Sequence, residues 1–152
     1  MNDRQNDALK LENQLCFPLY ACSRVVIKMY KPYLDKLDLT YTQYIALMIL
    51  WQEKQMTVKE MGQALYLDSG TLTPLLKKLE AKGFLTRARS TKDERNLIVT
   101  ITEKGEALKE QAAEMQQQMK ALCPICQKEA EALRHVLYKL IEGVEKSAEA
   151  EE

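Results

Sequence analysis

The four cysteines can act as nucleophiles, redox groups or metal ligands, and Cys16 has polar and aromatic neighbours that could support such chemistry. Tyr20 and Ser23 follow it at helical spacing, so a continuous helix would carry all three on one face. Only a thiolate attacks a peroxide oxygen, and the free N–H groups at a helix N-terminus stabilise such an anion. This position allows a redox-sensing role for Cys16, whereas a small buried apolar side chain is the commoner fate of a free cysteine.

An apolar stripe predicts the helix that would present Cys16. Its members recur in steps of three and four residues: Leu11, Leu15, Leu19, Cys22, Val26, Met29 and Tyr33. Pro18 interrupts the pattern, so the main helix either starts near Phe17 or kinks there. Cys22 lies on the stripe and is predicted to be a core residue.

A second pair of cysteines, Cys123 and Cys126, forms a Cys-X-X-Cys motif. Such a pair is a weak signal for redox or zinc chemistry, and the chain has a single histidine, His135, to help complete a zinc site. We expect neither a metal site nor a cofactor.

The pattern of residues 66–85 predicts a turn followed by a helix that ends near Gly83. Asp68 and Ser69 can cap the helix start, and Gly83 suits the left-handed position after its end. Leucines at helical spacing form a buried stripe: Leu72, Leu75, Leu76 and Leu79. The opposite face is short, polar and basic, which suits a DNA major groove. The predicted DNA-contacting residues of this helix are Ser69, Thr71, Thr73, Pro74 and Lys77.

The neighbouring segments complete a winged helix. Thr57 and Glu60 form a capping box at the start of a second short helix, 57–65, which gives helix-turn-helix spacing. Two short strands, 85–90 and 97–102, flank a polar turn. Basic side chains gather on this hairpin, where they can meet phosphates or a minor groove. The predicted DNA-contacting residues of the hairpin are Arg87, Lys92, Asp93 and Arg95. The alternative is a helical hairpin without a DNA role.

Helices flank this lobe on both sides. Thr40 or Thr42 caps the helix before it, Thr102 caps the long helix after it, and a last helix covers about 129–144. The fold class is mainly α with a small β-hairpin wing. We predict one domain, 1–152, with a winged helix-turn-helix lobe over about 41–102 and dimerisation helices over about 9–36 and 103–146.

The apolar helices at both chain ends predict a homodimer. A two-fold axis would place two recognition helices one DNA turn apart, roughly 34 Å, on a pseudo-palindromic double-stranded operator. The alternative is a monomer with a larger core.

The overall charge of the chain does not indicate a DNA-binding protein. Lys and Arg number 22 and so do Asp and Glu, so any DNA affinity must come from local charge between Lys77 and Arg95. No apolar run is long enough to span a membrane, and no signal-peptide pattern is present. We expect a cytoplasmic protein that does not bind membranes, with its cysteines reduced at rest.

These segments together resemble the MarR family of winged-helix repressors, and within it the OhrR branch that senses organic hydroperoxides. The similarity covers about residues 8–110. It is carried by Leu11-Glu-Asn-Gln-Leu-Cys-Phe17, Leu19-Tyr20, Ser23-Arg24, Tyr30-Lys-Pro32, Leu39-Thr-Tyr41, the run from Leu65 to Lys77, and Asp93-Glu-Arg95. The resemblance implies a homodimeric repressor in which an organic hydroperoxide oxidises Cys16 to a sulfenic acid, after which the dimer releases its operator. It also implies that Tyr30 and Tyr41 hydrogen-bond the reactive sulfur, with Tyr20 in the same sensor pocket.

Pro18 and the additional cysteines depart from the family pattern. Some family members form a disulfide with a cysteine near the other subunit's C-terminus, which makes Cys123 and Cys126 candidate resolving cysteines. A low-molecular-weight thiol is the alternative partner for the oxidised sulfur. The competing functions are a MarR-type repressor released by a small aromatic ligand, and a thiol peroxidase or disulfide enzyme. The sequence lacks a thioredoxin-like βαβ pattern, so we expect a non-enzyme.

Overall fold

The computed structural model describes residues 7–91 and 95–149, and the chain divides into two compact units after Gln116. The helices of the first unit include α2 (Cys16–Leu34), α3 (Tyr41–Glu53), α4 (Val58–Leu65), α5 (Ser69–Ala81) and the first part of α6 (Glu103–Leu122). Short 3-10 turns, Leu11–Asn13 and Asp35–Leu37, flank α2. The strands are β1 (Gln55–Thr57), β2 (Leu85–Arg89) and β3 (Leu97–Ile101). The second unit holds the end of α6 and α7 (Gln127–Glu149).

Reciprocal side-chain caps fix where two helices begin. Thr40, not Thr42, caps α3: its hydroxyl accepts from the Gln43 backbone at 3.3 Å, and the Gln43 side chain accepts from the Thr40 backbone at 2.9 Å. The predicted box of Thr57 and Glu60 starts α4, with the corresponding distances at 3.1 and 2.8 Å. Each box satisfies backbone N–H groups that the first turn leaves open.

The sheet has the order β1-β3-β2, with β3 antiparallel to both neighbours. β2 and β3 pair from Leu85 opposite Ile101 to Arg89 opposite Leu97, which is the predicted wing. The sequence analysis does not predict β1, because three residues are too few to show an alternating pattern.

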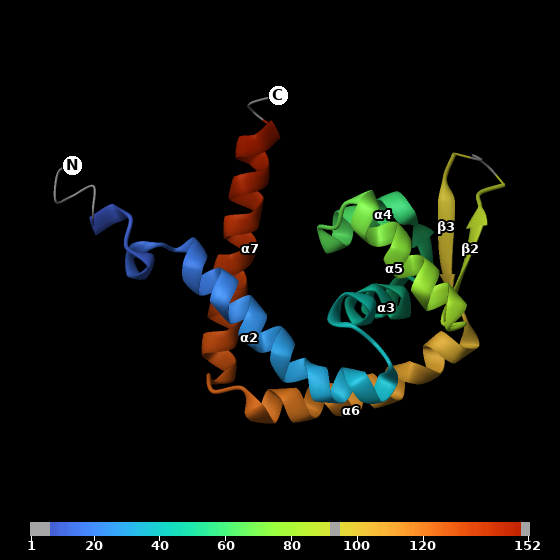
Figure 1. Cartoon of the computed structure of the whole chain (residues 1–152), viewed down its shortest axis with the longest axis horizontal. Coiled ribbons are helices and arrows are strands. Elements are labelled where there is room, and N and C mark those ends of the chain that lie inside the picture. Colours follow the sequence, from blue (N-terminus) through green and yellow to red (C-terminus); the bar gives the residue numbers. More distant parts are fainter. Residues whose placement is uncertain (1–6, 92–94, 150–152) are drawn as a thin grey trace. The chain divides into compact units, whose positions relative to one another are not determined.

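The core of the DNA-binding lobe lies between α3, α4, α5 and the sheet, with β2 beside α5 (Figure 1). Its most deeply buried side chains are Leu47, Leu50, Met61, Leu72, Leu76, Leu79, Leu85 and Val99. The start of α6 closes this core, because a Cβ on Gly105 would lie 2.1 Å from the Phe84 carbonyl oxygen. The Gly105 carbonyl accepts a hydrogen bond from Trp51 at 2.9 Å. Gly83 has φ +75°, as predicted for the residue that ends the recognition helix.

Helix α2 is continuous and begins at Cys16, so Pro18 does not kink it. Pro18 is the third residue of the helix, where a backbone N–H has no partner within the helix and its absence costs little. The prediction that Cys22 is a core residue is wrong for this chain, since Cys22 is exposed. Much of the apolar stripe of α2 has no covering element in the described chain; only Leu34, at the end of the helix, is buried.

The second unit carries another exposed apolar stripe. α7 is longer than the predicted 129–144 and leaves these side chains exposed: Leu133, Val136, Leu140 and Val144. No helix in the described ranges is both long and apolar enough to cross a membrane. Within the described residues, neither unit therefore covers these apolar faces of α2 and α7.

Candidate functional site

Cys16 is the first residue of α2, and its thiol is unbonded and exposed. Leu15 precedes it as the N-cap residue and provides no side-chain acceptor for the first-turn N–H groups. A helix that begins without a side-chain cap keeps its N-terminal N–H groups available to an anion. The start of α2 therefore leaves both the thiol and these N–H groups accessible to a reactant.

Tyr20 and Ser23 lie one and two turns beyond Cys16, and the continuity of α2 puts all three on one face, as predicted. The Tyr20 ring is exposed, and the Arg24 guanidinium lies 5.5 Å from its centroid. This part of α2 carries an aromatic and a cationic side chain that contact each other, about one and two turns along the helix from Cys16.

Tyr30 and Tyr41 belong to an aromatic cluster at the other end of α2. Their ring centroids are 5.3 Å apart in an edge-on arrangement, and Tyr44 lies 6.1 Å from Tyr30. Burial, together with the neighbouring Tyr30, raises the pKa of the Tyr41 phenol above its ordinary value. Burial also raises the pKa of Tyr44, although a hydrogen bond from the Gln116 side chain at 2.6 Å opposes this. The Tyr41 hydroxyl therefore stays protonated and can donate.

Within one chain, the structure does not bring Cys16 together with Tyr30 and Tyr41. Fourteen residues of continuous α-helix separate Cys16 from Tyr30, which corresponds to about 21 Å at 1.5 Å per residue. Tyr41 lies against Tyr30 and so belongs to the same distant end. A sensor pocket that contains the thiol and both phenols cannot be formed by a single copy of α2 and α3.

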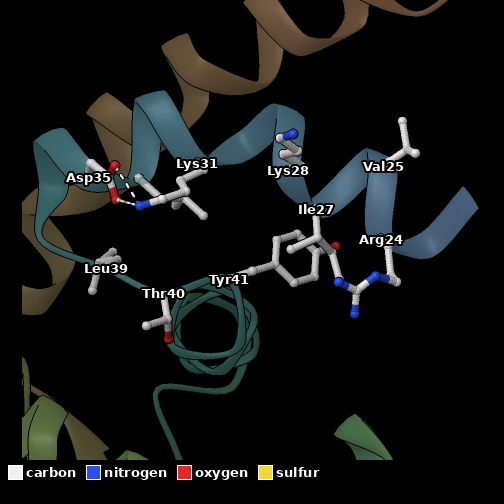
Figure 2. Close-up of a pocket in the computed structure, with 10 residues that line it drawn as sticks. Arg24, Val25, Ile27, Lys28, Lys31, Asp35, Leu39, Thr40 and Tyr41 are labelled. Carbon is white, nitrogen blue, oxygen red and sulfur yellow. Dashed lines mark hydrogen bonds and ion pairs between the residues drawn. The ribbon is translucent and has the colours of Figure 1, made fainter. Parts of the chain in front are cut away.

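A pocket of about 670 Å³ lies between α2 and the start of α3, at the tyrosine end (Figure 2). Its apolar lining includes Ile27, Leu39 and the Tyr41 ring. Its basic lining residues are Arg24, Lys28 and Lys31. Lys31 is paired with Asp35 at 2.8 Å, but both side chains are largely exposed and the pair contributes little stability. The pocket can accept a small apolar molecule with a negative group.

The predicted DNA-contacting residues of α5 share its exposed face: Ser69, Thr71, Thr73, Pro74 and Lys77. Asp68 is the N-cap, and its carboxylate accepts from the Thr71 backbone and hydroxyl, both at 2.9 Å. These hydrogen bonds lower the pKa of Asp68. Thr71 is thus already engaged in the cap, whereas Thr73 and Lys77 point away from the buried leucines. Pro74 lies inside the helix, so the Gly70 carbonyl loses its usual partner.

Arg87 lies in β2 and donates hydrogen bonds to the Glu80 carboxylate of α5. Its backbone N–H donates to one carboxylate oxygen at 2.9 Å, and its guanidinium donates to the other at 2.6 and 3.0 Å. Hydrogen bonds from Arg87 lower the pKa of Glu80. This geometry gives Arg87 a role in joining the wing to the recognition helix. Arg95 is exposed near the wing tip, whereas Lys92 and Asp93 lie outside the described residues.

Cys123 and Cys126 lie in the connection between α6 and α7, and both are exposed and form no disulfide. In the described part of the chain, no group of three or more His, Cys, Asp or Glu side chains is placed to hold a metal ion. Sequence reasoning overlooked two contributors to these sites. Glu80 carries no motif, and only the packing of α5 on β2 reveals it. Tyr44 carries no motif either, and only its packing beside Tyr30 places it in the aromatic cluster.

Comparisons with known proteins indicate the same architecture. A family profile described as "Transcriptional regulator SarA/Rot" matches residues 28–112, more than half of the chain. The organic hydroperoxide resistance transcriptional regulator of Bacillus subtilis is 51% identical over 136 residues, which cover 90% of this chain and 92% of that protein. The chain belongs to the MarR family, in its OhrR branch.

Solved MarR-family structures share the fold. Reduced AbfR bound to DNA, a Staphylococcus epidermidis protein, is 33% identical, with a TM-score of 0.79 over 93% of this chain and 97% of that chain. A disulfide-formed AbfR structure aligns with a TM-score of 0.60 at 32% identity, over 98% and 99%. MarR aligns at 21% identity with a TM-score of 0.68, over 85% and 98%, and this likeness concerns the fold alone.

Proposed function

We propose that this chain is a DNA-binding transcriptional repressor that senses organic hydroperoxides through oxidation of Cys16 and releases its operator when oxidised. The observation that carries the proposal is the exposed Cys16 thiol at the uncapped start of α2. The 51% identity to a regulator of organic hydroperoxide resistance supports the same function. The DNA-bound and disulfide forms of AbfR support a link between thiol state and DNA binding.

The chemistry at Cys16 is a two-electron oxidation. The thiolate attacks one peroxide oxygen, the O–O bond breaks, and the alkoxide leaves and takes up a proton to become an alcohol. The product is a sulfenic acid. Attack by a second thiol on this sulfur then forms a disulfide and releases water; the candidates are a low-molecular-weight thiol and the partner subunit's Cys123 or Cys126.

The sensor pocket requires a homodimer, because one chain keeps Cys16 and Tyr30 about 21 Å apart. The exposed apolar faces of α2 and α7 are suited to pack on a second copy. In such a dimer, the partner's Tyr30 and Tyr41 can reach Cys16 and donate hydrogen bonds to its thiolate. Their rings, with Tyr20, provide an apolar site that favours an organic hydroperoxide over hydrogen peroxide.

DNA recognition is assigned to α5 and the wing. Thr73, Pro74 and Lys77 lie on the outer face of α5, where they can meet base edges and phosphates of a pseudo-palindromic operator. Oxidation at the dimer interface would change the spacing of the two recognition helices, so that they no longer fit two half-sites. In this scheme peroxide is consumed once per sensing event, and the protein is a regulator, not an enzyme.

The test measures binding to a DNA duplex that the reduced protein has selected from a random-sequence pool. Cumene hydroperoxide should weaken binding of the wild type at least tenfold, and Cys16→Ser should bind equally well with and without it. Cys22→Ser is the matched control and should respond like the wild type. Release of DNA by oxidised Cys16→Ser would remove Cys16 from the mechanism.

A repressor released by a small aromatic ligand is the second candidate, because the pocket between α2 and α3 combines an apolar wall with cationic side chains. An aromatic carboxylate such as benzoate would then release DNA from Cys16→Ser as readily as from the wild type. A wild-type protein that responds to benzoate but not to hydroperoxide would favour this function over the redox sensor.

A further inference from the structure

The turn between α6 and α7 carries two thiols that a one-cysteine sensor does not need. Cys123 follows the last residue of α6 and Cys126 precedes the first residue of α7, with a bend at Pro124 and Ile125. Figure 1 shows the short connection that joins the two helices. Free cysteines are usually buried, so packing does not account for a pair of exposed thiols at this spacing.

Backbone hydrogen bonds hold both ends of the turn. The Cys123 N–H donates to the Lys120 carbonyl at 3.2 Å, and the Cys126 carbonyl accepts from the Ala130 N–H at 3.0 Å. The two cysteines are three positions apart, on either side of the bend, and both lie outside the helices. A disulfide spans Cα separations of about 4.4–6.8 Å, so closing one requires adjustment of this connection only.

The two thiols differ in their surroundings. Cys126 is the N-cap of the long helix α7, whose N-terminus favours negative charge. The Glu129 carboxylate accepts from the Cys126 backbone N–H at 2.8 Å and from its side chain, and these hydrogen bonds lower the pKa of Glu129. The N-terminus of α7 favours negative charge at Cys126, but the Glu129 carboxylate opposes it, and Cys123 follows the negative end of α6. Either thiol of the pair can therefore attack first.

We propose that Cys123 and Cys126 form a second redox site, a dithiol that exchanges with small-molecule disulfides and closes into an intrachain disulfide. One thiol of the pair, as its thiolate, attacks one sulfur of the small disulfide, whose S–S bond breaks, and the leaving thiolate takes up the proton that this thiol lost. The other cysteine then attacks the cysteine sulfur of the mixed disulfide and expels the second small thiol. The protein pair loses two electrons and two protons, and the small disulfide gains them.

The test uses the full chain with Cys16→Ser and Cys22→Ser, so that Cys123 and Cys126 are its only thiols. The sensing cysteine is absent, so this experiment and the test of the proposed function can fail independently. The protein is incubated with glutathione disulfide, treated with an alkylating reagent and measured by intact mass. We expect the mass to fall by two hydrogen atoms, with no glutathione, no alkyl group and no covalent dimer.

Single replacements in the same background provide the matched comparison. Adding Cys123→Ser should trap one glutathione on Cys126, because no neighbouring thiol can expel it. Adding Cys126→Ser should likewise trap one glutathione on Cys123. Circular dichroism checks that each variant keeps its helices. Two glutathiones on the parent variant, a covalent dimer, or two thiols that remain free to alkylation would each overturn the proposal.

Discussion

Cys16 and Tyr41 are each the first residue of a helix, α2 and α3 respectively, but their surroundings give them opposite properties. The Cys16 thiol is exposed beside an uncapped helix start. Tyr41 is half-buried against Tyr30, and this burial raises the pKa of its phenol above a value at which it is already protonated at neutral pH. The Cys16 thiol is therefore open to an oxidant, and the Tyr41 hydroxyl can donate a hydrogen bond.

Replacing Tyr41 by Phe tests that division of roles. The variant loses one hydrogen bond to a charged sulfur, which is worth about 1.5 kcal/mol, so Cys16 oxidation should slow by about tenfold. The rate is measured by intact mass during reaction with cumene hydroperoxide. Tyr66→Phe, in the exposed turn after α4, is the matched control and should react at the wild-type rate. An unchanged rate in Tyr41→Phe would exclude its hydroxyl from the sensor pocket.

The Asp68 cap predicts a pH dependence of stability. A carboxyl whose pKa is lowered in the folded state stabilises the fold above its unfolded pKa, about 3.9, and loses this contribution as pH falls through the folded value. Asp68→Asn still accepts a hydrogen bond but does not titrate. Urea unfolding at about pH 7 and about pH 3 should show a smaller acid loss for Asp68→Asn than for the wild type. The exposed Asp35→Asn serves as control, and identical acid losses in all three proteins would contradict the prediction.

Helix α5 shows how a single element separates stability from recognition. Its leucines are buried, and its short polar side chains and Lys77 are exposed. The helix is joined to the wing through Glu80 and Arg87, so the two DNA-facing elements are positioned together. Neighbouring substitutions on α5 should therefore have different consequences.

Leu76→Ala should destabilise the lobe by about 2–5 kcal/mol, because Leu76 is 1% exposed and its removal leaves a cavity. Urea unfolding measures the loss. The adjacent exposed substitution Lys77→Ala should change stability by no more than about 0.5 kcal/mol. Equal losses in the two variants would show that the buried stripe does not support the lobe.

Lys77→Ala should instead weaken DNA binding. If Lys77 meets a phosphate, affinity falls similarly for all sequences, and the slope of log K against log salt decreases by about one. Fluorescence anisotropy at several salt concentrations measures both quantities. Lys109→Ala, an exposed lysine of α6, is the control that should keep the wild-type slope. A wild-type slope in Lys77→Ala would place this side chain away from the DNA backbone.

At the scale of the whole molecule, two long helices display apolar faces that neither compact unit covers. On α2 the exposed residues include Phe17, Val25 and Val26, and on α7 they include Val136 and Leu140. Apolar surface of this extent is typical of an association site. A second copy of the chain is the occupant that would also supply tyrosines to Cys16.

Leu140→Arg tests the dimer. A cation in an apolar interface costs several kcal/mol, so the dissociation constant should rise on the order of 100-fold. Sedimentation equilibrium measures it. Glu142→Arg, half a helical turn away on the polar side of α7, should leave association unchanged. A wild-type protein that sediments as a monomer would overturn the dimer and, with it, a pocket shared between two chains.

Local patterns in the sequence determined the winged helix, since its signals lie within a few residues of one another. Capping residues at Thr57 and Asp68, the leucine period of α5 and the glycine at 83 predict elements that the structure confirms. These features depend on backbone geometry and on residue spacing, which a single segment contains. The sequence left open whether the first helix starts near Phe17 or kinks at Pro18, and the structure starts it at Cys16.

Only the tertiary structure decided which distant side chains meet. It pairs Arg87 with Glu80, exposes Cys22, and sets Tyr30 beside Tyr41 but far along α2 from Cys16. Each outcome depends on how separate elements pack, and no short segment records that packing. A stripe of apolar residues predicts that one face of a helix is buried, but not what covers it. The covering surface can belong to the same chain or to a second copy, and only the folded structure shows which surfaces are available.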